Sequence, residues 1–396
     1  MSTILVVNSG SSSFKYQLIE VESEKVLASG LVERIGEESG HSRHTTQVGL
    51  WEREVPIPDH AAGFGVMLEA FQEHGPSLDA NPLAAVGHRV VHGGKRFHEA
   101  TVITDLVKIN IEDLEELAPL HNPANLQGIE AAQEAFPDVP QVAVFDTAFH
   151  QTLPPAAYTY AIDATLADKQ RIRRYGFHGT SHKYVSGAAA EFLGRPLEEL
   201  KLIVLHLGNG ASVCAVDGGM SVETSMGMTP LEGLVMGTRS GDIDPAVLFH
   251  LNRKTGMGFA ELDELLNRKS GLLGLSGHGD MRDVQKAAAA GDAAAALALE
   301  VYLHRIRGYV GNYYAQLGHL DAIVFTAGVG ENGPAVRAGA LAGLSELGIS
   351  VDPVLNEVES RSPRYISPAT SPVAVLVVPT NEELEIARQS LAAVSG

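Results

Sequence analysis

Short apolar segments rich in valine, isoleucine and leucine alternate along the chain with longer stretches of helical pattern. Each apolar run ends in glycine, asparagine, aspartate or threonine, as in residues 84–94, 141–150, 201–210, 321–330 and 373–383. Between them lie helical patterns such as residues 125–136 and the alanine-rich residues 283–306. This alternation predicts an α/β fold with buried strands. Functional side chains in such folds gather at the carboxyl ends of the strands.

The pattern of residues 5–21 returns about 200 residues later in residues 201–223. In both places an apolar strand leads through a small polar turn into a second, alternating strand. Asp217, Gly218 and Gly219 then form a typical hairpin signal. We therefore expect a duplicated architecture with a cleft between two halves. We expect residues 1–149, rejoined by a helix over 383–396, to form the first domain, and 150–382 to form a nucleotide-binding domain.

The charge and composition exclude several classes of partner. The 396 residues carry a formal charge of −19, so any anionic ligand needs a local basic site, and we expect neither nucleic acid nor membrane as a partner. The single cysteine, Cys214, excludes an intrachain disulfide and fits a reducing compartment. No basic leader and no apolar stretch of about 18 residues is present, so we expect a cytoplasmic protein.

Two polar turns are candidate anion sites. The first runs from Asn8 to Ser13 and is followed by Lys15; it lacks the P-loop pattern, yet its amides and the lysine could hold a phosphate. The second, residues 206–210, contains two glycines and Asn209. Alone, the first is better explained as a plain polar hairpin, and a plain turn is also the alternative for the second. One such turn in each half favours an anion shared by the two halves.

Residues 328–333 match the G-x-G-x-x-G pattern of dinucleotide-binding loops. Glu331 would then stand among pyrophosphate oxygens, and Pro334 follows the third glycine. A mononucleotide held against a glycine-rich strand end fits this segment better.

Two arginines and two acids stand at the ends of apolar segments. Arg89 and Arg239 have glycine-rich, nearly uncharged surroundings, which suits carboxylate or phosphate binding. A structural ion pair of Arg239 with residue 242 or 244 is the alternative. Asp146 and Glu382 follow apolar strands, where a carboxylate can hold Mg²⁺, although Glu382 also suits the first turn of a helix.

Histidines spaced four residues apart occur within residues 88–92 and again as His178 and His182. Residues four apart in a strand are about 13 Å apart, which argues against zinc at the first pair. For the second pair we expect Thr180 or Ser181 to cap a helix that begins after His178. We therefore expect no zinc site.

Taken together, these segments resemble the acetate kinase family. The resemblance covers residues 8 to about 388 and rests on "NSGSSSFKYQL", "GHRVVHGG", "APLHNP", "FDTAFH", "RRYGFHGTSH", "HLGNGASV", "MGTRSGDIDP", "FTAGVGEN" and "PTNEELEIAR". It implies an α/β fold of two duplicated ribonuclease-H-like domains, as in the acetate and sugar kinase, Hsp70 and actin superfamily, with a nucleotide cleft between them.

The resemblance also implies roles for individual residues. The catalytic residues it implies are Arg89, Asp146, His178 and Arg239. Those placed around the acetate are Arg89, Val91, Leu120, Phe177 and Pro230. Those around Mg²⁺ are Asn8 and Glu382. Those around ATP are Lys15, His206, Leu207, Gly208, Asn209, Gly210, Asp280, Met281, Arg282, Gly328, Val329, Gly330, Glu331 and Asn332.

The implied reaction is reversible, direct in-line transfer of the γ-phosphoryl group of ATP to acetate, giving acetyl phosphate and ADP. Mg²⁺ is the implied metal, which Mn²⁺ could replace, and a homodimer is the implied assembly. Residues 278–281 depart from the serine-rich stretch common in the family, which leaves the base preference open. A kinase for propionate or another short carboxylate, an ATP-driven module like Hsp70 or actin, and a dehydrogenase remain alternatives.

Overall fold

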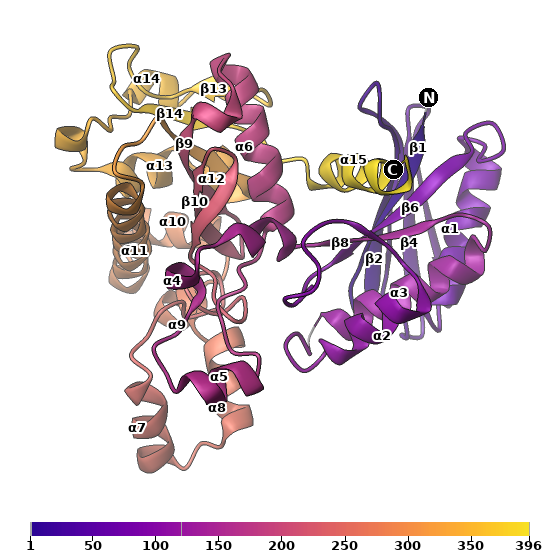
Figure 1. Ribbon diagram of the computed structural model, residues 1–396, viewed down its shortest axis with the longest axis horizontal. Coiled ribbons are helices and arrows are strands. Elements are labelled where there is room, and N and C mark those ends of the chain that lie inside the picture. Colours follow the sequence, from indigo (N-terminus) through magenta and orange to yellow (C-terminus); the bar gives the residue numbers. More distant parts are fainter. Residues whose placement is uncertain (1, 120, 396) are drawn as a thin grey trace. The chain divides into compact units, whose positions relative to one another are not determined.

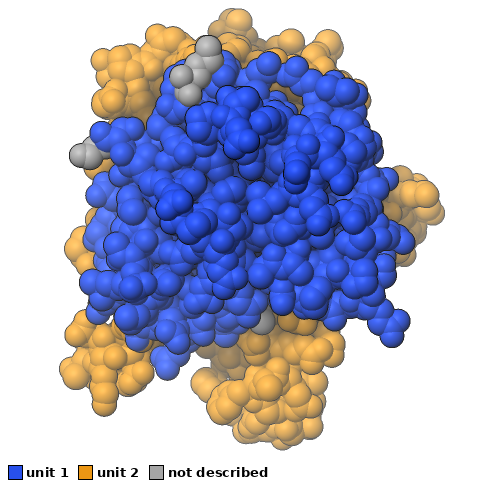
Figure 2. All heavy atoms as spheres, turned by 90° about the vertical axis from the view of Figure 1, so that its right-hand side faces the viewer, with its two compact units in different colours: residues 1–151, 381–396 blue, residues 152–380 orange. Residues whose placement is uncertain are grey.

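The computed structural model describes residues 2–119 and 121–395. The chain divides into two compact units, which Figure 2 colours separately. Unit 1 comprises Met1–Gln151 and Asn381–Gly396, and unit 2 comprises Thr152–Thr380. No helix among the described residues is long and apolar enough to cross a bilayer.

Unit 1 is built on a mixed sheet with the strand order β5-β4-β3-β2-β1-β6-β8-β7 in its described part. Strand β1 pairs antiparallel with β2 and parallel with β6, which in turn pairs parallel with β8. The strands are β1 (Thr3–Ser9), β2 (Ser13–Glu20), β3 (Lys25–Glu33), β4 (Gly40–Thr46), β5 (Leu50–Val55), β6 (Leu83–Val90), β7 (Thr101–Val102) and β8 (Gln141–Phe145).

Helices cover both faces of this sheet (Figure 1). Helices α1 and α3 supply residues to the buried cluster on one face, whereas α15 packs against β1 and β6 on the other, where Gly87 leaves room for Ser390. The helices of unit 1 are α1 (His60–His74), α2 (Asp105–Asp113), α3 (Asn122–Ala135) and α15 (Glu382–Ser395), and the 3-10 helix η1 (Ala148–Thr152) crosses the unit boundary.

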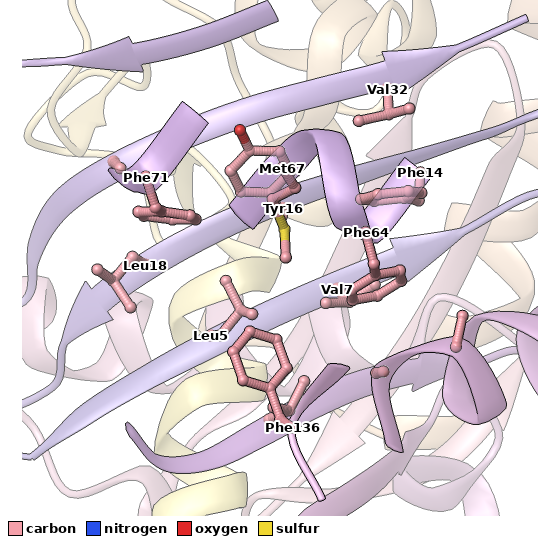
Figure 3. Packing of buried hydrophobic residues seen from close by; sticks show 14 of the residues in the cluster. Leu5, Val7, Phe14, Tyr16, Leu18, Val32, Phe64, Met67, Phe71 and Phe136 are labelled. Carbon is pink, nitrogen blue, oxygen red and sulfur yellow. The ribbon is translucent and has the colours of Figure 1, made fainter. Parts of the chain in front are cut away.

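The alternation of β2 explains which face it buries. Phe14, Tyr16 and Leu18 are at most 1% exposed and lie in the cluster that Figure 3 shows, with Phe64 of α1 among their neighbours. Lys15 lies between them in sequence and points to the other face, where it is exposed. Each buried side chain of this size stabilises the fold by roughly 1.5–3 kcal/mol. The register of the first hairpin is fixed in this way.

Unit 2 repeats the topology of the centre of unit 1. Its described sheet has the order β11-β10-β9-β12-β14-β13, with β9 antiparallel to β10 and parallel to β12. Strands β11-β10-β9-β12-β14 thus correspond to β3-β2-β1-β6-β8, so the predicted duplication and the α/β class are confirmed. The strands are β9 (Lys201–Leu207), β10 (Ala211–Asp217), β11 (Met220–Thr224), β12 (Ala322–Thr326), β13 (Arg364–Tyr365) and β14 (Ala374–Val377).

The predicted hairpin at Gly218 and Gly219 joins β10 to β11, and both glycines have positive φ. Helices α6 and α11 pack on the unit 2 sheet. The helices are α4 (Pro155–Tyr158), α5 (Ala164–Lys169), α6 (Gly179–Leu193), η2 (Leu197–Glu199), α7 (Ala246–Thr255), α8 (Phe259–Arg268), α9 (Gly271–Ser276), α10 (Met281–Ala289), α11 (Ala293–Leu317), α12 (Ala327–Asn332), α13 (Pro334–Leu341), η3 (Ser345–Leu347) and α14 (Pro353–Asn356).

The alanine-rich segment is helical, as its pattern predicts, but it forms two helices. It is broken at Gly291, whose φ is +92°, into α10 and α11. Asp292 then caps α11 by accepting hydrogen bonds from the amides of Ala294 and Ala295. Glycine and an N-cap aspartate outweigh the helix propensity of the surrounding alanines.

Candidate functional site

The carboxyl ends of three neighbouring strands in unit 1 carry the first group of candidate residues. Arg89 is the penultimate residue of β6, and Asp146 directly follows β8. The Asp146 amide donates to the carbonyl of Val90 at 3.0 Å, which fixes the backbone beside the arginine. Parallel pairing of β6 with β1 and with β8 brings these positions to one edge of the sheet, as sequence analysis predicted.

Arg89 and Asp146 form a two-pronged ion pair. Nη2 of Arg89 donates to Oδ2 of Asp146 at 2.7 Å, and Nε lies 3.1 Å from Oδ1. The Asp146 side chain is 1% exposed and that of Arg89 is 24% exposed. Attraction to the Asp146 carboxylate raises the pKa of Arg89 above its usual range. The pair holds the guanidinium in one orientation while part of its edge still reaches solvent.

Glu382 belongs to the same electrostatic environment. It is the first residue of α15, so the expected helix start is present. Burial raises the pKa of its carboxyl to about 7; attraction to Arg89 lowers it, whereas repulsion from Asp146 and Glu383 raises it. Near pH 7 this carboxyl is therefore only partly ionised, and a cation beside it would favour the carboxylate form.

The first polar turn connects β1 and β2. Asn8 pairs with Lys15 across the two strands, and the amide of Gly10 donates to the carbonyl of Ser13 at 2.7 Å. Asn8 and Lys15 line a groove of about 330 Å³ that also includes Glu383. Lys15 is exposed, and none of the described carboxylates forms an ion pair with it.

Side chains that sequence analysis missed support this turn from behind. His60 of α1 lies 2.9 Å from the carbonyl oxygen of Gly10. Asn125 of α3, which is 4% exposed, donates to the carbonyl of Ser9 at 2.8 Å and accepts from the amide of Val91 at 3.1 Å. Asn125 thus links the turn to the segment after Arg89. The sequence of α3, which contains several other polar residues, did not single Asn125 out.

Val91 lies one residue beyond β6, so the strand assumed over residues 88–92 ends at Val90. Its neighbours leave the strand because other side chains bind their backbone. Asn122 bonds both the amide and the carbonyl of His92 at 3.1 Å, and Thr147 accepts from the amide of Gly93 at 2.9 Å. Val91 itself is 8% exposed.

The other predicted acetate-pocket residues are distributed over the two units. Leu120 lies outside the described residues. Phe177 in unit 2 is 2% exposed. Pro230, also in unit 2, accepts a hydrogen bond through its carbonyl oxygen from Nη1 of Arg239 at 2.8 Å.

The second polar turn in unit 2 borders a cavity of about 420 Å³. The amide of Gly208 donates to the carbonyl of Gly210 at 3.0 Å, and the carbonyl of Asn209 accepts from the amide of Gly237. Eight residues expected around ATP line the cavity: Gly208, Asn209, Asp280, Met281, Arg282, Gly328, Val329 and Asn332. Sequence analysis did not name the other lining residues, which are Gly237, Leu272, Gly279, Gln285, Tyr302 and Gly333.

The G-x-G-x-x-G segment is not an open strand-end turn. After β12 it forms the short helix α12, entered through Ala327 at φ +63°. The Glu331 carboxylate accepts from the amides of Ala327 at 2.9 Å and of Thr380 at 3.2 Å. Glu331 therefore stabilises the start of its own helix.

His178 occupies the N-cap position of α6, so the expected cap at Thr180 or Ser181 was wrong. Its φ is +56°, the left-handed region that is strained for a residue other than glycine. The amide of Gly176, two residues earlier, donates to the carbonyl of Gly227, which holds the chain at this bend. Such strain at a polar residue is typical of functional sites.

Arg239 differs from Arg89 in its partners. The expected alternative, an ion pair with residue 242 or 244, is absent from the described residues: Asp242 instead accepts from Tyr309 at 2.7 Å and lies 3.6 Å from Arg305. Burial lowers the pKa of Arg239. A β-carbon built on Gly210 would lie 3.2 Å from Nη2 of Arg239 and 3.6 Å from Nε2 of His178. Because Gly210 has no side chain, space is left beside the guanidinium of Arg239 and the imidazole of His178.

Within residues 2–119 and 121–395, no three histidine, cysteine or acidic side chains are grouped as a metal site. A site made only from protein ligands of these types is therefore not formed there.

Comparison with known proteins gave consistent matches over the whole chain. The model of the acetokinase family matches residues 3–388. The acetate kinase of Clavibacter michiganensis subsp. michiganensis is 70% identical over 396 residues, covering 100% of both chains. That of Geobacillus kaustophilus is 53% identical over 389 residues, covering 98% of both.

A solved structure gave an equally extensive match. The acetate kinase from Porphyromonas gingivalis superposes with a TM-score of 0.95 at 43% identity, covering 100% of both chains.

Proposed function

Because the chain belongs to the acetokinase family, we propose that it transfers the γ-phosphoryl group of ATP to acetate, giving acetyl phosphate and ADP. The observation that carries this proposal is the Arg89–Asp146 pair at the sheet edge of unit 1. It presents a fixed guanidinium edge that suits a carboxylate or a phosphoryl group. The glycine-bordered cavity of unit 2 supplies room for a nucleotide.

The acceptor side needs no strong base. An acetate oxygen is already ionised at pH 7, so it can attack phosphorus without losing a proton. We therefore propose that Arg89 binds the acetate carboxylate and then the transferring group. Asp146 holds Arg89 in place, and Val91, Leu120, Phe177 and Pro230 surround the methyl group.

The donor side is proposed to use His178 and Arg239 as stabilisers of the charge that spreads over the phosphoryl oxygens. Lys15 contacts the ATP phosphates. Around the nucleotide we propose His206, Leu207, Gly208, Asn209, Gly210, Asp280, Met281, Arg282, Gly328, Val329, Gly330, Glu331 and Asn332. Catalysis is then positioning together with electrostatic stabilisation.

The residues of unit 1 fit a magnesium ion. Asn8 and Glu382 offer oxygen ligands, and burial, together with repulsion from Asp146 and Glu383, raises the pKa of Glu382, so that a cation beside it would favour its carboxylate form. Mg²⁺ usually keeps several water ligands and shares phosphate oxygens, so two protein residues are enough. When bound, the ion would neutralise phosphate charge. We propose Mg²⁺, with Mn²⁺ as a substitute.

We further propose that residues 150–382 form the nucleotide-binding domain. On the strength of the family resemblance, we propose a cytoplasmic homodimer. Light scattering of the purified protein tests the assembly: a mass near 84 kDa, twice the 42.0 kDa of one chain, is expected.

Propionate is the second candidate acceptor, because a propionate kinase from Francisella tularensis subsp. tularensis superposes with a TM-score of 0.93 at 42% identity. A hydroxylamine-trapping assay with ATP, Mg²⁺ and acetate, propionate or butyrate distinguishes the acceptors. One methylene changes selectivity by about 1–3 kcal/mol, so we expect acetate first and propionate as a poorer substrate. If the protein hydrolyses ATP at a rate that no carboxylate changes, the result would instead support an ATP-driven module like Hsp70 or actin. Binding of NAD would support a dehydrogenase.

A further inference from the structure

A buried serine joins two histidines in unit 2. Ser212 of β10 is 0% exposed, and its Oγ lies 2.9 Å from Nδ1 of His178 and 2.8 Å from Nε2 of His182. His182 lies in α6, one turn after the N-cap histidine, and is also 0% exposed. The hydroxyl therefore bridges the helix start and the sheet at hydrogen-bonding distance to both rings.

The chemistry of this bridge links the two rings. A serine hydroxyl carries one proton and can accept at its lone pairs. Ser212 can therefore donate to only one of the two histidines, and the other must donate its own N–H to Oγ. Consequently, the tautomer of His178 depends on that of His182 whenever both rings are neutral.

The surroundings of His178 indicate which arrangement the reaction needs. Nε2 of His178 and Nη2 of Arg239 both border the space that a β-carbon on Gly210 would occupy. Phosphoryl oxygens only accept hydrogen bonds, so a stabilising histidine must present Nε2–H there. In the neutral ring Nδ1 is then an acceptor, which requires Ser212 to donate to it and His182 to donate Nε2–H to Ser212.

We propose that Ser212 and His182 are positioning residues that hold His178 in the Nε2–H tautomer for phosphoryl transfer. This inference rests on the proposed function, since it takes the phosphoryl group to be the species beside Nε2. The two residues do not touch substrate in this proposal. They act only through the ring of His178.

The ring is also fixed in orientation, so its tautomer is the remaining variable. His178 stacks on His206 with ring centroids 4.2 Å apart. His206 is in turn held by Oγ of Ser181, which lies 2.8 Å from its Nδ1 and 2.8 Å from Oγ1 of Thr380. The stacked ring and the left-handed N-cap backbone leave His178 little freedom to turn its other nitrogen outward.

Ser212→Ala tests the bridge, and Ser186→Ala is its matched control. Like Ser212, Ser186 is buried, but it lies in α6 and its hydroxyl donates to the backbone carbonyl of His182 at 2.7 Å rather than to a histidine ring. We expect Ser212→Ala to lower kcat about ten- to a hundredfold, with KM for acetate and ATP unchanged within about twofold. We expect Ser186→Ala to keep kcat within about twofold. An unchanged kcat in a folded Ser212→Ala protein would overturn the proposal.

A second pair of variants guards against misfolding at position 212. His182→Gln keeps an N–H donor in the side chain, whereas His182→Leu removes it. We expect the glutamine variant to retain kcat within about threefold, and the leucine variant, in which Ser212 keeps its hydroxyl but is no longer held as a donor, to lose more than the glutamine variant and less than Ser212→Ala. A purely structural histidine predicts equal losses for both variants, and that result would refute the positioning role.

The direct measurement is nitrogen-15 NMR of histidine-labelled wild-type protein, about two pH units above the usual histidine pKa of ~6.5. His178 is assigned by its loss in His178→Gln. We expect Nε2 protonated and Nδ1 unprotonated, with a shift toward the Nδ1–H form in Ser212→Ala. A wild-type Nδ1–H ring contradicts the proposal. Because the spectrum needs no turnover, it decides the question even if no acetyl phosphate forms and the proposed function fails.

Discussion

The two candidate arginines stand in opposite electrostatic surroundings. In unit 1, Arg89 is held by two prongs of the buried Asp146 carboxylate. In unit 2, Arg239 bonds the carbonyl oxygen of Pro230, and among the described residues no carboxylate pairs with it. One guanidinium is neutralised by the protein, and the other is left with its charge uncompensated.

This difference suggests a division of labour. In a paired arginine the orientation of the guanidinium is fixed and most of its positive charge is balanced by the carboxylate. Such a group is suited to orienting a substrate carboxylate. An arginine without a counter-ion is destabilised in its resting state, as the lowered pKa of Arg239 reflects. It gains most when new negative charge arrives beside it. Such an interaction stabilises a transition state more than a ground state.

The largest expected effect is that of Arg89→Met. It removes the carboxylate clamp and leaves Asp146, 1% exposed, without its partner. We expect activity to fall by about 10³-fold and the free energy of unfolding by about 2–4 kcal/mol. The hydroxylamine-trapping assay measures the loss of activity, and urea unfolding measures the loss of stability.

Arg53→Met is the control for that prediction, because Arg53 pairs with Glu69 on the surface, where both side chains are more than half exposed. Its stability should change by less than about 1 kcal/mol. An Arg89→Met protein as stable as the control would contradict the buried ion pair as a structural element.

Arg239→Leu should separate activity from stability. We expect kcat to fall at least about a hundredfold, KM for acetate to change less, and the melting temperature to stay within about 2 °C, because no buried carboxylate loses its partner. The exposed Arg268→Leu serves as a control with full activity. Near-normal kcat in Arg239→Leu would remove it from the catalytic residues.

Glu382→Gln tests the charge balance around Arg89. A folded-state pKa of about 7, above the ordinary 4.5, means that the folded protein binds this proton more tightly than the unfolded chain. The resulting stability is complete below about pH 4.5 and is lost as pH rises through 7. Glutamine should therefore stabilise the metal-free protein by about 1–2 kcal/mol at pH 8 and not at pH 5.

The same variant should raise the Mg²⁺ concentration for half activity more than about tenfold, since the amide replaces an anionic ligand. Parallel titrations with Mn²⁺ compare the two ions. An unchanged metal requirement would leave Glu382 only its role at the start of α15.

Val91→Ala is expected to have the smallest effect, in substrate preference. If Val91 limits the space beyond the acceptor carboxylate, the propionate-to-acetate ratio of kcat/KM should rise up to about tenfold, or 1.4 kcal/mol. Val86→Ala, in the core of β6, should lower stability without changing that ratio. An unchanged ratio in a destabilised Val91→Ala protein would assign Val91 to the core.

Patterns within short segments predicted much of this fold. The alternation of Phe14, Lys15 and Tyr16 and the glycines at 218 and 219 are local signals, and the structure agrees with both. The duplicated topology could be inferred from the repeat of residues 5–21 because each half forms its first hairpin from nearby residues.

The supporting residues could not be predicted because their partners lie far away in sequence. Asn125 bonds Ser9 across 116 residues, and Ser181 bonds Thr380 across 199. Val91 leaves the strand pattern because Asn125 binds its amide. The sequence shows Glu331 only as an acidic residue within a glycine-rich pattern. Its structural role also depends on a hydrogen bond that its carboxylate accepts from the distant amide of Thr380.

The most direct test of the difference between the arginines is calorimetric binding of ADP, acetate, Mg²⁺ and aluminium fluoride as a mimic of the transferring phosphoryl group. Arg239→Leu should weaken binding of this complex by at least about a hundredfold while leaving the affinity for ADP alone within about threefold. Equal affinity of wild type and Arg239→Leu for the complete mimic would contradict the assignment of Arg239 to charge that arises only during transfer.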